Sequence, residues 1–405
     1  MTERLYYHDS HLTEFHARVV GIAEDAAGRV AVTLDRTAFY PTGGGQPGDT
    51  GTLGAARVVE CVDEDEAGVR HIIEGTTPQL GARVEGHVDW LRRLDHLQQH
   101  TGQHILSQAF IQLFGDAPTR AFRMLERACE IDVDLRDPSN ERIEEAVELA
   151  NRIIWEDRPV RVRHVSAEEA AALPLRKDSA REGNLRIIEI ESFDLSPCGG
   201  THAARTGEVG IVAVRSWERA KGLTRVEFIA GGRVLADYRR ANHTGRAVAA
   251  LFSAGRDNAL ELVARSLEEN KTLLRRLRTL EEIAARVEAE ELIHTATPGG
   301  DAHTHIVTHI FADRDAESLK RLALSIIARP GHIALLGSRD EHTARLVFAR
   351  AADASGDMNT LLCEACTLLD GRGGGRPDLA QGGGTKVENL AGVLQTALSR
   401  LVATQ

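Results

Sequence analysis

The stretch DHLQQHTGQH, residues 95–104, places His96, His100 and His104 at a spacing of four residues. Apolar residues around it recur at helical intervals, so we predict an α-helix here. On a helix, each step of four residues turns a side chain by about 40° and raises it by about 6 Å. The three imidazoles therefore line one face, which is typical of a metal site when further ligands come from elsewhere in the chain.

A second segment, SPCGGTH at residues 196–202, offers such ligands because Cys198 and His202 are again four residues apart. Metal–ligand bonds are about 2.0–2.3 Å long, so His96 and His104, about 12 Å apart along the helix, do not readily share one ion. An adjacent pair of histidines can. One thiolate with three imidazoles suits Zn²⁺ better than Mg²⁺ or Ca²⁺. The alternative is a solvated helix face and an unrelated glycine turn.

Composition sets the broad class of the protein. The chain has 405 residues, a net charge of −11 and five cysteines, which predicts two to four domains without a disulfide framework. No apolar run approaches the roughly 18 residues of a membrane span, and the N-terminus lacks a signal-peptide core, so we expect a cytoplasmic protein that makes no membrane contact. The acidic balance does not exclude nucleic acid, because a local basic face can bind phosphate.

The first 92 residues are predicted to form a small β-barrel with a glycine-rich loop. Apolar and polar side chains alternate in RVAVTLD, residues 29–35, and in RVEGHVDW, residues 83–90, and turn residues separate such runs. After Trp90 the apolar spacing becomes helical. Residues 93–232 mix helices with strands such as CEIDVDL, residues 129–135, and are predicted to form an α+β metal-binding domain.

A helical linker is predicted over residues 233–298, followed by a small α/β domain over residues 299–405. Leu260, Leu267 and Leu274 keep a heptad spacing, with Asn270 in the seam. Two interpretations stay open: a helix pair that packs within one chain, and a coiled coil that forms a dimer. The whole chain is therefore assigned to the α+β class.

Four motifs now carry a resemblance to a known family. HTGQH, residues 100–104, followed by CGGTH, residues 198–202, is similar to the zinc motif pair of the editing domain of alanyl-tRNA synthetases, which freestanding AlaX-type editing proteins share and which threonyl-tRNA synthetase has in related form. Three further segments resemble the family in the same order: RTAFYPTGGGQPGDTG at 36–51, TGEVGIVAVRSWERAKGLTRVEFIAGG at 206–232 and GRGGGRPDLAQGGGTK at 371–386. Together they cover most of the chain.

The resemblance implies one zinc ion per chain, with the ligands His100, His104, Cys198 and His202. His96 then falls outside the metal shell. It either supports a ligand from behind, contacts tRNA or is merely exposed, and we expect it to be exposed. The chain begins directly in the β region, so it resembles the long AlaX form, which has an editing module, a helical linker and a C-terminal domain but no module that charges tRNA. Four protein ligands suggest a closed structural site, whereas a hydrolytic zinc keeps one position open. Either Cys198 binds weakly or yields its place, so that zinc can activate water, or zinc mainly positions the aminoacyl group.

The glycine-rich loop PTGGGQPGD, residues 41–49, has two interpretations. On its own it is typical of a tight β-turn. The resemblance implies that the loop lines the amino-acid pocket, where Thr37 would bind a serine hydroxyl and Gln46 would contact the terminal ribose or the attacking water. The substrate-binding set is then Thr37, Gly44, Gly45 and Gln46. Gln103 stands where the synthetases often have threonine, which leaves the role of this position open.

The C-terminal glycine-rich segment is predicted to contact tRNA, because its backbone N–H groups can approach phosphate with arginines as counter-charges. The predicted contacts are Arg372, Gly374, Gly375, Arg376, Gln381 and Gly383. A plain flexible loop is the alternative. Nearby, Cys363 and Cys366 form a lone CxxC among apolar residues at helical spacing, and we interpret them as two helix residues rather than metal ligands.

The resemblance thus predicts a trans-editing hydrolase, with no catalytic residue assigned beyond the zinc site. Its substrate would be tRNA(Ala) carrying a wrong amino acid, chiefly Ser-tRNA(Ala) and also Gly-tRNA(Ala), because a small pocket cannot reject these amino acids by binding alone. The alternatives are editing of Ser-tRNA(Thr) and a non-catalytic zinc-stabilised RNA-binding module. A homodimer through the linker and the C-terminal domain is a further expectation.

Overall fold

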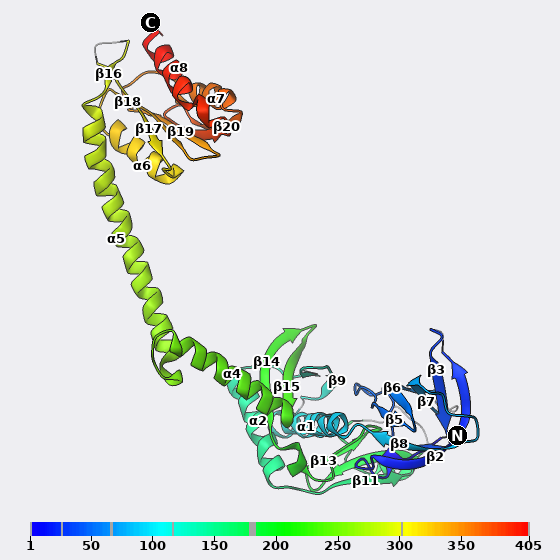
Figure 1. Ribbon diagram of the computed structural model, residues 1–405. Helices are drawn as coiled ribbons and strands as arrows, with labels where there is room; N and C mark the ends of the chain where they lie inside the picture. Colours follow the sequence, from blue (N-terminus) through cyan, green and yellow to red (C-terminus); the bar gives the residue numbers. More distant parts are fainter. Residues whose placement is uncertain are drawn as a thin grey trace. The chain divides into compact units, whose positions relative to one another are not determined.

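The computed structural model describes residues 2–25, 27–64, 68–115, 117–177, 184–300 and 303–403. The chain has a mixed α+β fold, as predicted, and divides into two compact units, Met1–Val248 and Ala249–Gln405 (Figure 1). In the part of the chain that is described, no helix combines the length and the hydropathy needed to cross a membrane.

The first unit begins with a closed six-stranded barrel, which confirms the predicted N-terminal barrel. In spatial order its strands are β2 (Glu14–Glu24), β3 (Val30–Leu34), β7 (Val69–Gly75), β6 (Ala56–Asp63), β5 (Gly51–Leu53) and β8 (Arg83–Val88). Burial alternates along β2, where Phe15, Ala17 and Val19 point into the barrel core, as expected for a strand with one face in a core. Two short strands, β1 (Glu3–Arg4) and β4 (Arg36–Thr37), pair in parallel beside it.

The histidine segment lies on helix α1 (Trp90–Phe114), which follows the barrel directly. The helix begins where the Asp89 side chain accepts a hydrogen bond from the Arg92 backbone N–H, and it ends at Gly115, whose φ of 71° is readily adopted only by glycine. Its apolar residues, including Ile105 and Phe110, belong to the largest hydrophobic core. Helix α2 (Asn140–Trp155) contributes to the same core.

Two sheets complete the first unit around α1 and α2. The larger has the strand order β14 (Val212–Ala220), β15 (Leu223–Ala230), β10 (Cys129–Val133) and β9 (Thr119–Met124). The smaller consists of β11 (Val160–Val165), β12 (Leu185–Ile190) and β13 (Asp194–Pro197), which leads into the CGGTH segment. The short helix α3 (Ala167–Ala171) follows β11 and begins with a capping box between Ser166 and Glu169.

A buried ion pair fastens the barrel to α1. The fully buried Arg93 guanidinium on α1 contacts Asp49 of the glycine-rich loop at 2.5 Å, and it also donates to the backbone carbonyls of Ser10 and Ala38. Removing one partner of such a pair leaves a buried charge and typically costs about 3–5 kcal/mol. The pair therefore holds the loop at a defined position against the histidine helix.

The predicted helical stretch over residues 233–298 consists mainly of two helices. Helix α4 (Gly232–Ala250) ends near Ser253, whose φ of 55° is left-handed and incompatible with continuing the helix. Helix α5 (Ala259–Ile293) belongs to the second unit, where Ala285 and Ala289 are buried and Glu288 forms an ion pair with Arg314 at 2.6 Å. The structure divides into two units, so the predicted division of the chain into four domains stays a prediction.

The heptad leucines lie on α5 and are exposed. Leu260, Leu267 and Leu274 expose 82%, 67% and 54% of their surface. In the part of the chain that is described, these three leucines pack little against the second unit, to which α5 belongs, and the helix-pair interpretation stays a prediction. The coiled coil between two chains stays a prediction.

The second unit is built on a six-stranded sheet covered by helices on both faces. Its strand order is β16 (Thr297–Pro298), β17 (His305–Ala312), β18 (His332–Arg339), β19 (Ala344–Arg350), β21 (Leu379–Gly384) and β20 (Gly371–Arg376). Successive residues of β18 enter different cores: Ile333 and Leu335 pack with α7 (Met358–Leu368) and α8 (Leu390–Ala403), whereas Ala334 and Leu336 pack with α5 and α6 (Ala316–Ile327). This alternation is the signature of a strand buried on both faces.

The glycine-rich C-terminal segment forms the antiparallel strands β20 and β21, so the flexible-loop alternative is wrong. A Cβ atom at Gly373 or Gly382 would lie 2.8 or 2.6 Å from the Cys366 sulfur, which is too close for any other residue. The glycines thus let α7 approach the sheet. Cys366 is buried and Cys363 exposed on this helix, which confirms that the CxxC is a pair of helix residues.

Candidate metal centre

Helix α1 and the CGGTH segment bring four possible ligands together. The ligand atoms of His100, His104, Cys198 and His202 all lie within 4.8 Å of one another. The Cys198 sulfur is 3.4 Å from His100 Nε2 and 3.3 Å from His202 Nε2. Tetrahedral zinc with Zn–S of about 2.3 Å and Zn–N of about 2.0–2.1 Å would place such atoms about 3.5 Å apart. The donor set and its spacing therefore fit a zinc ion.

Local packing explains why the histidines of α1 face this cluster. Gly102 lies on the opposite side of the helix, where an added Cβ would be 3.1 Å from both Ala230 and Val212. The larger sheet thus presses closely on that side of α1, and His100 and His104 are left on the side that faces the CGGTH segment. Their ring centroids each lie 4.5 Å from that of His202.

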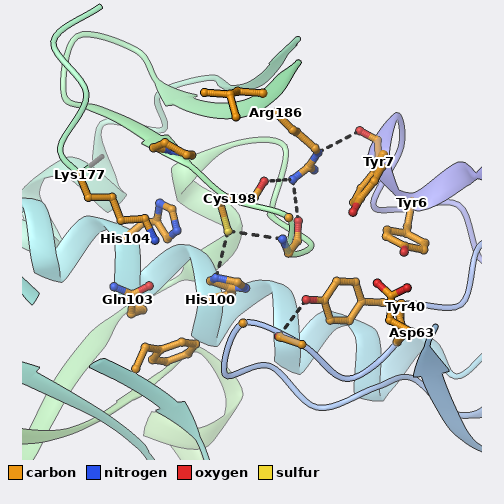
Figure 2. A pocket seen from close by; sticks show the side chains of 18 of the residues that line it. Tyr6, Tyr7, Tyr40, Asp63, His100, Gln103, His104, Lys177, Arg186 and Cys198 are labelled. Carbon is orange, nitrogen blue, oxygen red and sulfur yellow. Dashed lines mark hydrogen bonds between the residues drawn. The ribbon is translucent and has the colours of Figure 1, made fainter. Parts of the chain in front are cut away.

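Arg186 fixes the shape of the CGGTH segment. Its Nη1 donates to the backbone carbonyls of Cys198 at 2.8 Å and Gly200 at 2.9 Å, and its Nε donates to the carbonyl of Tyr7 at 3.3 Å. The guanidinium also lies 5.2 Å from the centroid of the Tyr7 ring, within cation–π range. One side chain therefore ties the metal-binding segment to the N-terminal segment of the chain (Figure 2).

The three imidazoles use their second nitrogen to bond outward. Nδ1 of His100 donates to Gln46 Oε1 at 2.7 Å. Nδ1 of His104 donates to Asp194 Oδ2 at 3.1 Å, and Nδ1 of His202 contacts Thr101 Oγ1 at 3.3 Å. Such outer partners fix the tautomer and leave Nε2 available to a metal.

The protonation states also suit a metal. Burial raises the pKa of the Cys198 thiol, but the neighbouring His100 and His202 together lower it by more. The net pKa of the thiol therefore lies well below its ordinary value. Burial lowers the pKa of His100 and, more strongly, that of His202. Burial opposes ionisation of Asp194, yet Arg176 at 2.8 Å and then His104 hold the pKa of its carboxyl below the ordinary value. A thiolate and neutral imidazoles are the forms that bind metal.

A cavity of about 720 Å³ opens beside the cluster (Figure 2). Its wall includes His100 and His104 together with aromatic and basic side chains from the N-terminal segment, from the position just before the glycine-rich loop and from β12. Among them are Tyr6, Tyr7, Tyr40, Arg4 and Arg186. Aromatic faces stack on nucleobases and arginines attract phosphate. A cavity of this size and lining can hold a nucleotide that carries a small acyl group.

The glycine-rich loop is a tight turn and also reaches the cavity, so its two interpretations are compatible. Gly43 and Gln46 exchange two backbone hydrogen bonds, and Gly44 lines the cavity. Gly45 has a φ of 82°, and a Cβ there would lie 2.4 Å from the Phe122 carbonyl oxygen. Gln46 is buried and bonds His100 and Thr201. The structure thus places Gln46 behind a ligand, and its predicted contact with ribose or water stays a prediction.

Thr37 lies elsewhere than predicted. It is fully buried, and its hydroxyl donates to His71 Nε2 at 2.8 Å while accepting from the Phe39 N–H at 3.1 Å. The opposite nitrogen of His71 donates to the Val32 carbonyl at 3.0 Å, which fixes this tautomer. Thr37 is absent from the described lining of the cavity. The predicted contact with a serine hydroxyl is therefore wrong for this geometry.

His96 is buried, at 3% exposure, and not exposed as predicted. It lies outside the four-residue cluster, with Nδ1 3.9 Å from Asp49 Oδ1 and without a hydrogen-bond partner within the described chain. Burial lowers its pKa to about 4. The reason is that α1 is covered by the barrel on one side and by the larger sheet on another, so a helical stripe of histidines does not face solvent.

The outer partners were missed from the sequence. Thr101 lies within HTGQH, and Asp194 precedes Cys198 by four residues in β13, where the apolar Leu195 and Pro197 would have placed the carboxylate on the outer side, although Asp194 is buried. No signal marked Arg186 either. The predicted tRNA contacts of the second unit all lie on one hairpin, with Arg372, Gly374, Gly375 and Arg376 on β20 and Gln381 and Gly383 on β21.

Comparison with known proteins identifies the family. Residues 185–227, which span β12 to β15 and include Cys198 and His202, match the threonyl and alanyl tRNA synthetase second additional domain, and residues 303–403 match the DHHA1 domain. The alanyl-tRNA editing protein AlaX-L of Pyrococcus horikoshii is 31% identical over 94% of this chain and 94% of its own. The chain belongs to the AlaX-L family.

This chain is also similar to parts of larger proteins. The alanine–tRNA ligases of Methanobrevibacter smithii and Pyrobaculum neutrophilum are 27% and 32% identical over 98% and 94% of this chain. The chain spans only 45% and 42% of those ligases. A crystal structure of the C-Ala domain from Aquifex aeolicus alanyl-tRNA synthetase is 23% identical and covers 27% of this chain and 98% of its own, with a TM-score of 0.25.

Proposed function

We propose that this protein hydrolyses the ester bond of mischarged tRNA(Ala), chiefly Ser-tRNA(Ala) and also Gly-tRNA(Ala), at a zinc site. The observation that carries the proposal is the four-donor cluster in the wall of a cavity of about 720 Å³. The similarity to an alanyl-tRNA editing protein over 94% of the chain supports the choice of tRNA(Ala). Serine exceeds alanine by one hydroxyl and glycine lacks one methyl, so a second hydrolytic site is needed to remove them.

The proposed zinc ligands are His100, His104, Cys198 and His202, one ion per chain. When bound, zinc would lower the pKa of a water molecule, polarise the ester carbonyl or orient the aminoacyl group. Gln46, Thr101 and Asp194 hold the three imidazoles with Nε2 directed at the cluster. Cys198 and His202 are carried by a segment that Arg186 fixes through two carbonyls. The chain thus preorganises its donors before substrate binds.

The cavity wall would bind the terminal nucleotide. Tyr6 lies edge-on to both Tyr7 and Tyr40, with ring centroids 4.9 and 5.4 Å away, which builds an aromatic wall. Arg186 beside Tyr7 bonds backbone carbonyls and, within the described chain, no carboxylate, and its positive charge suits a phosphodiester. In the second unit, the β20–β21 hairpin, with Arg372 and Arg376, would add a second tRNA contact. A homodimer through the exposed leucines of α5 is part of the proposal.

The second candidate substrate is Ser-tRNA(Thr), because the family that matches residues 185–227 includes threonyl-tRNA synthetase domains. The DHHA1 match and the AlaX-L relative favour the alanine system. A zinc-stabilised RNA-binding module without catalysis is the third candidate. Deacylation assays on purified Ser-, Gly- and Ala-tRNA(Ala) and on Ser-tRNA(Thr) separate these three. Zinc retention without ester cleavage on any of them would favour the non-catalytic module.

Loss of single ligands tests the zinc site itself. His100→Ala and His202→Ala should lower the zinc content and abolish deacylation, because an incomplete shell holds the metal poorly. His96→Ala should retain zinc, since this buried histidine lies outside the cluster. Metal analysis that finds one zinc per chain in both ligand variants would refute the proposed ligand set.

A further inference from the structure

Gln103 stands in the cavity wall between two proposed metal ligands. It lies on α1, is 5% exposed, and lines the cavity together with His100 and His104 (Figure 2). Its position on the helix is fixed by the same packing that directs the two histidines. A polar group at this point is therefore held close to where the aminoacyl group of a substrate would meet the metal.

The amide of Gln103 is tethered on one side only. Its Nε2 donates to Ser107 Oγ at 2.7 Å, one helical turn further along, and Thr119 Oγ1 donates to the same oxygen at 2.6 Å. Ser107 is fully buried, so this anchor does not exchange with solvent. Within the described residues, no hydrogen bond reaches Gln103 Oε1. The tether thus presents a fixed, unused acceptor.

Neighbouring hydroxyl groups are already engaged. Thr42 Oγ1 accepts from the Gly48 N–H at 2.9 Å, and the Tyr40 hydroxyl donates to the Gly43 carbonyl at 2.9 Å. Thr37, the residue predicted to recognise serine, is committed to His71 inside the barrel. Gln103 Oε1 differs from these oxygens because it carries no hydrogen bond within the described chain, so it is open to a serine hydroxyl in the cavity.

We propose that Gln103 Oε1 accepts a hydrogen bond from the side-chain hydroxyl of the seryl group, so that Gln103 is a specificity-determining residue. This inference rests on the proposed editing function. Alanyl and glycyl groups have no side-chain donor and would leave Oε1 unpaired, so the contact favours Ser-tRNA(Ala) over the cognate Ala-tRNA(Ala). One neutral hydrogen bond corresponds to about a two- to tenfold difference in kcat/KM.

The test is Gln103→Met in the full chain, which keeps the length of the side chain and removes its polar groups. We expect kcat/KM for Ser-tRNA(Ala) to fall about two- to tenfold, while the values for Gly- and Ala-tRNA(Ala) and the zinc content stay at those of the unmodified protein. Gln108→Met is the matched control, because Gln108 lies on the same helix and is absent from the described lining of the cavity. Gln108→Met should leave the ratio of kcat/KM for Ser-tRNA(Ala) to that for Ala-tRNA(Ala) unchanged; this is called the Ser to Ala ratio below.

Ser107→Ala tests the tether. Removing the anchor should lower the Ser to Ala ratio in the same direction, and the double variant with Gln103→Met should lose no more than Gln103→Met alone, because both changes act on one contact. An equal loss on all three esters, or an unchanged Ser to Ala ratio in Gln103→Met, would overturn the assignment. An unmodified protein that cleaves none of the esters would instead overturn the editing function, so the two failures are distinguishable.

Discussion

Gly200→Ala should weaken metal binding, although it adds one methyl group to a residue that is not itself a ligand. A Cβ built at Gly200 lies 2.2 Å from His100 Cε1, 2.5 Å from His100 Nδ1 and 3.0 Å from Gln46 Oε1. Ordinary contact begins at about 3.4 Å, so the imidazole ring would have to retreat by about 1.2 Å. The tolerance of a metal–ligand bond is only about 0.2 Å.

The ring has no free direction in which to retreat. Its Nδ1 is hydrogen-bonded to the buried Gln46 at 2.7 Å, and Gln46 is itself held by Thr201 at 2.8 Å. Overpacking of this kind typically costs about 1–3 kcal/mol. Disturbing the partner of a ligating histidine typically costs about 10- to 100-fold in metal affinity. We therefore expect Gly200→Ala to weaken zinc affinity by about that factor.

Gly199→Ala is the matched control within the same motif. The nearest atom to its Cβ is the Tyr7 hydroxyl at 3.7 Å, which is an ordinary contact. Competition with a chromophoric chelator measures the zinc affinity of both variants, and thermal unfolding of the metal-free proteins separates metal loss from misfolding. Equal zinc affinity in Gly200→Ala and Gly199→Ala would refute the argument that the close approach of Gly200 to His100 shapes the site.

Three further predictions address the barrel and the second unit. Thr37→Val should lower the free energy of unfolding by about 1–3 kcal/mol, because it leaves His71 Nε2 buried and unpaired. The rates of Ser-tRNA(Ala) and Gly-tRNA(Ala) cleavage should change by the same factor. A rate loss confined to Ser-tRNA(Ala) would restore Thr37 as a substrate contact. Burial lowers the pKa of His71 from 6.5 to about 4, so at pH values between these two the unfolded chain binds more protons than the folded chain. Lowering the pH from 7 to 5 should therefore reduce the free energy of unfolding by about 2 kcal/mol. Urea titrations should show that a His71→Gln variant does not lose this amount. Replacing Arg372 and Arg376 with glutamine should reduce the slope of log affinity for tRNA(Ala) against log salt concentration by about two, with kcat and zinc content unchanged. An unaltered slope would mean that the β20–β21 hairpin does not contact phosphate.

The proximity of the donors within each pair could be predicted because it depends on local geometry, whereas the expectation that the two pairs form one site came from the family resemblance. Spacings of four residues in HTGQH and CGGTH place each pair of donors on one side of a short segment, whatever surrounds it. The barrel could likewise be predicted, since period-two alternation in strands such as β2 survives in any sheet with one buried face. The antiparallel strands of residues 371–384 could not, because strands made mainly of glycine carry no apolar alternation.

The errors have one cause, which is burial imposed by distant segments. Nothing in residues 95–104 shows that the barrel covers the His96 side of α1, and nothing in residues 36–42 shows that Thr37 points at His71 across the barrel. The break after α4 is of another kind, because it lies in the local backbone, where Ser253 has a left-handed φ. The burial of His96 and the position of Thr37 both depend on contacts between residues far apart in sequence.

The barrel supplies the metal site with more than a wall for the cavity. A buried polar cluster is stable only if each donor and acceptor is paired, and His100 obtains its partner from Gln46, which lies in a loop of the barrel. That loop is anchored to α1 by the ion pair of Asp49 with Arg93. Asp49 lies three residues after Gln46 in the loop, and Arg93 lies seven residues before His100 on the helix. One ion pair therefore sets the distance across which the Gln46–His100 hydrogen bond forms. The barrel and the histidine helix act as one unit at this site, because the first carries the residue that orients a ligand and the second carries the ligand itself.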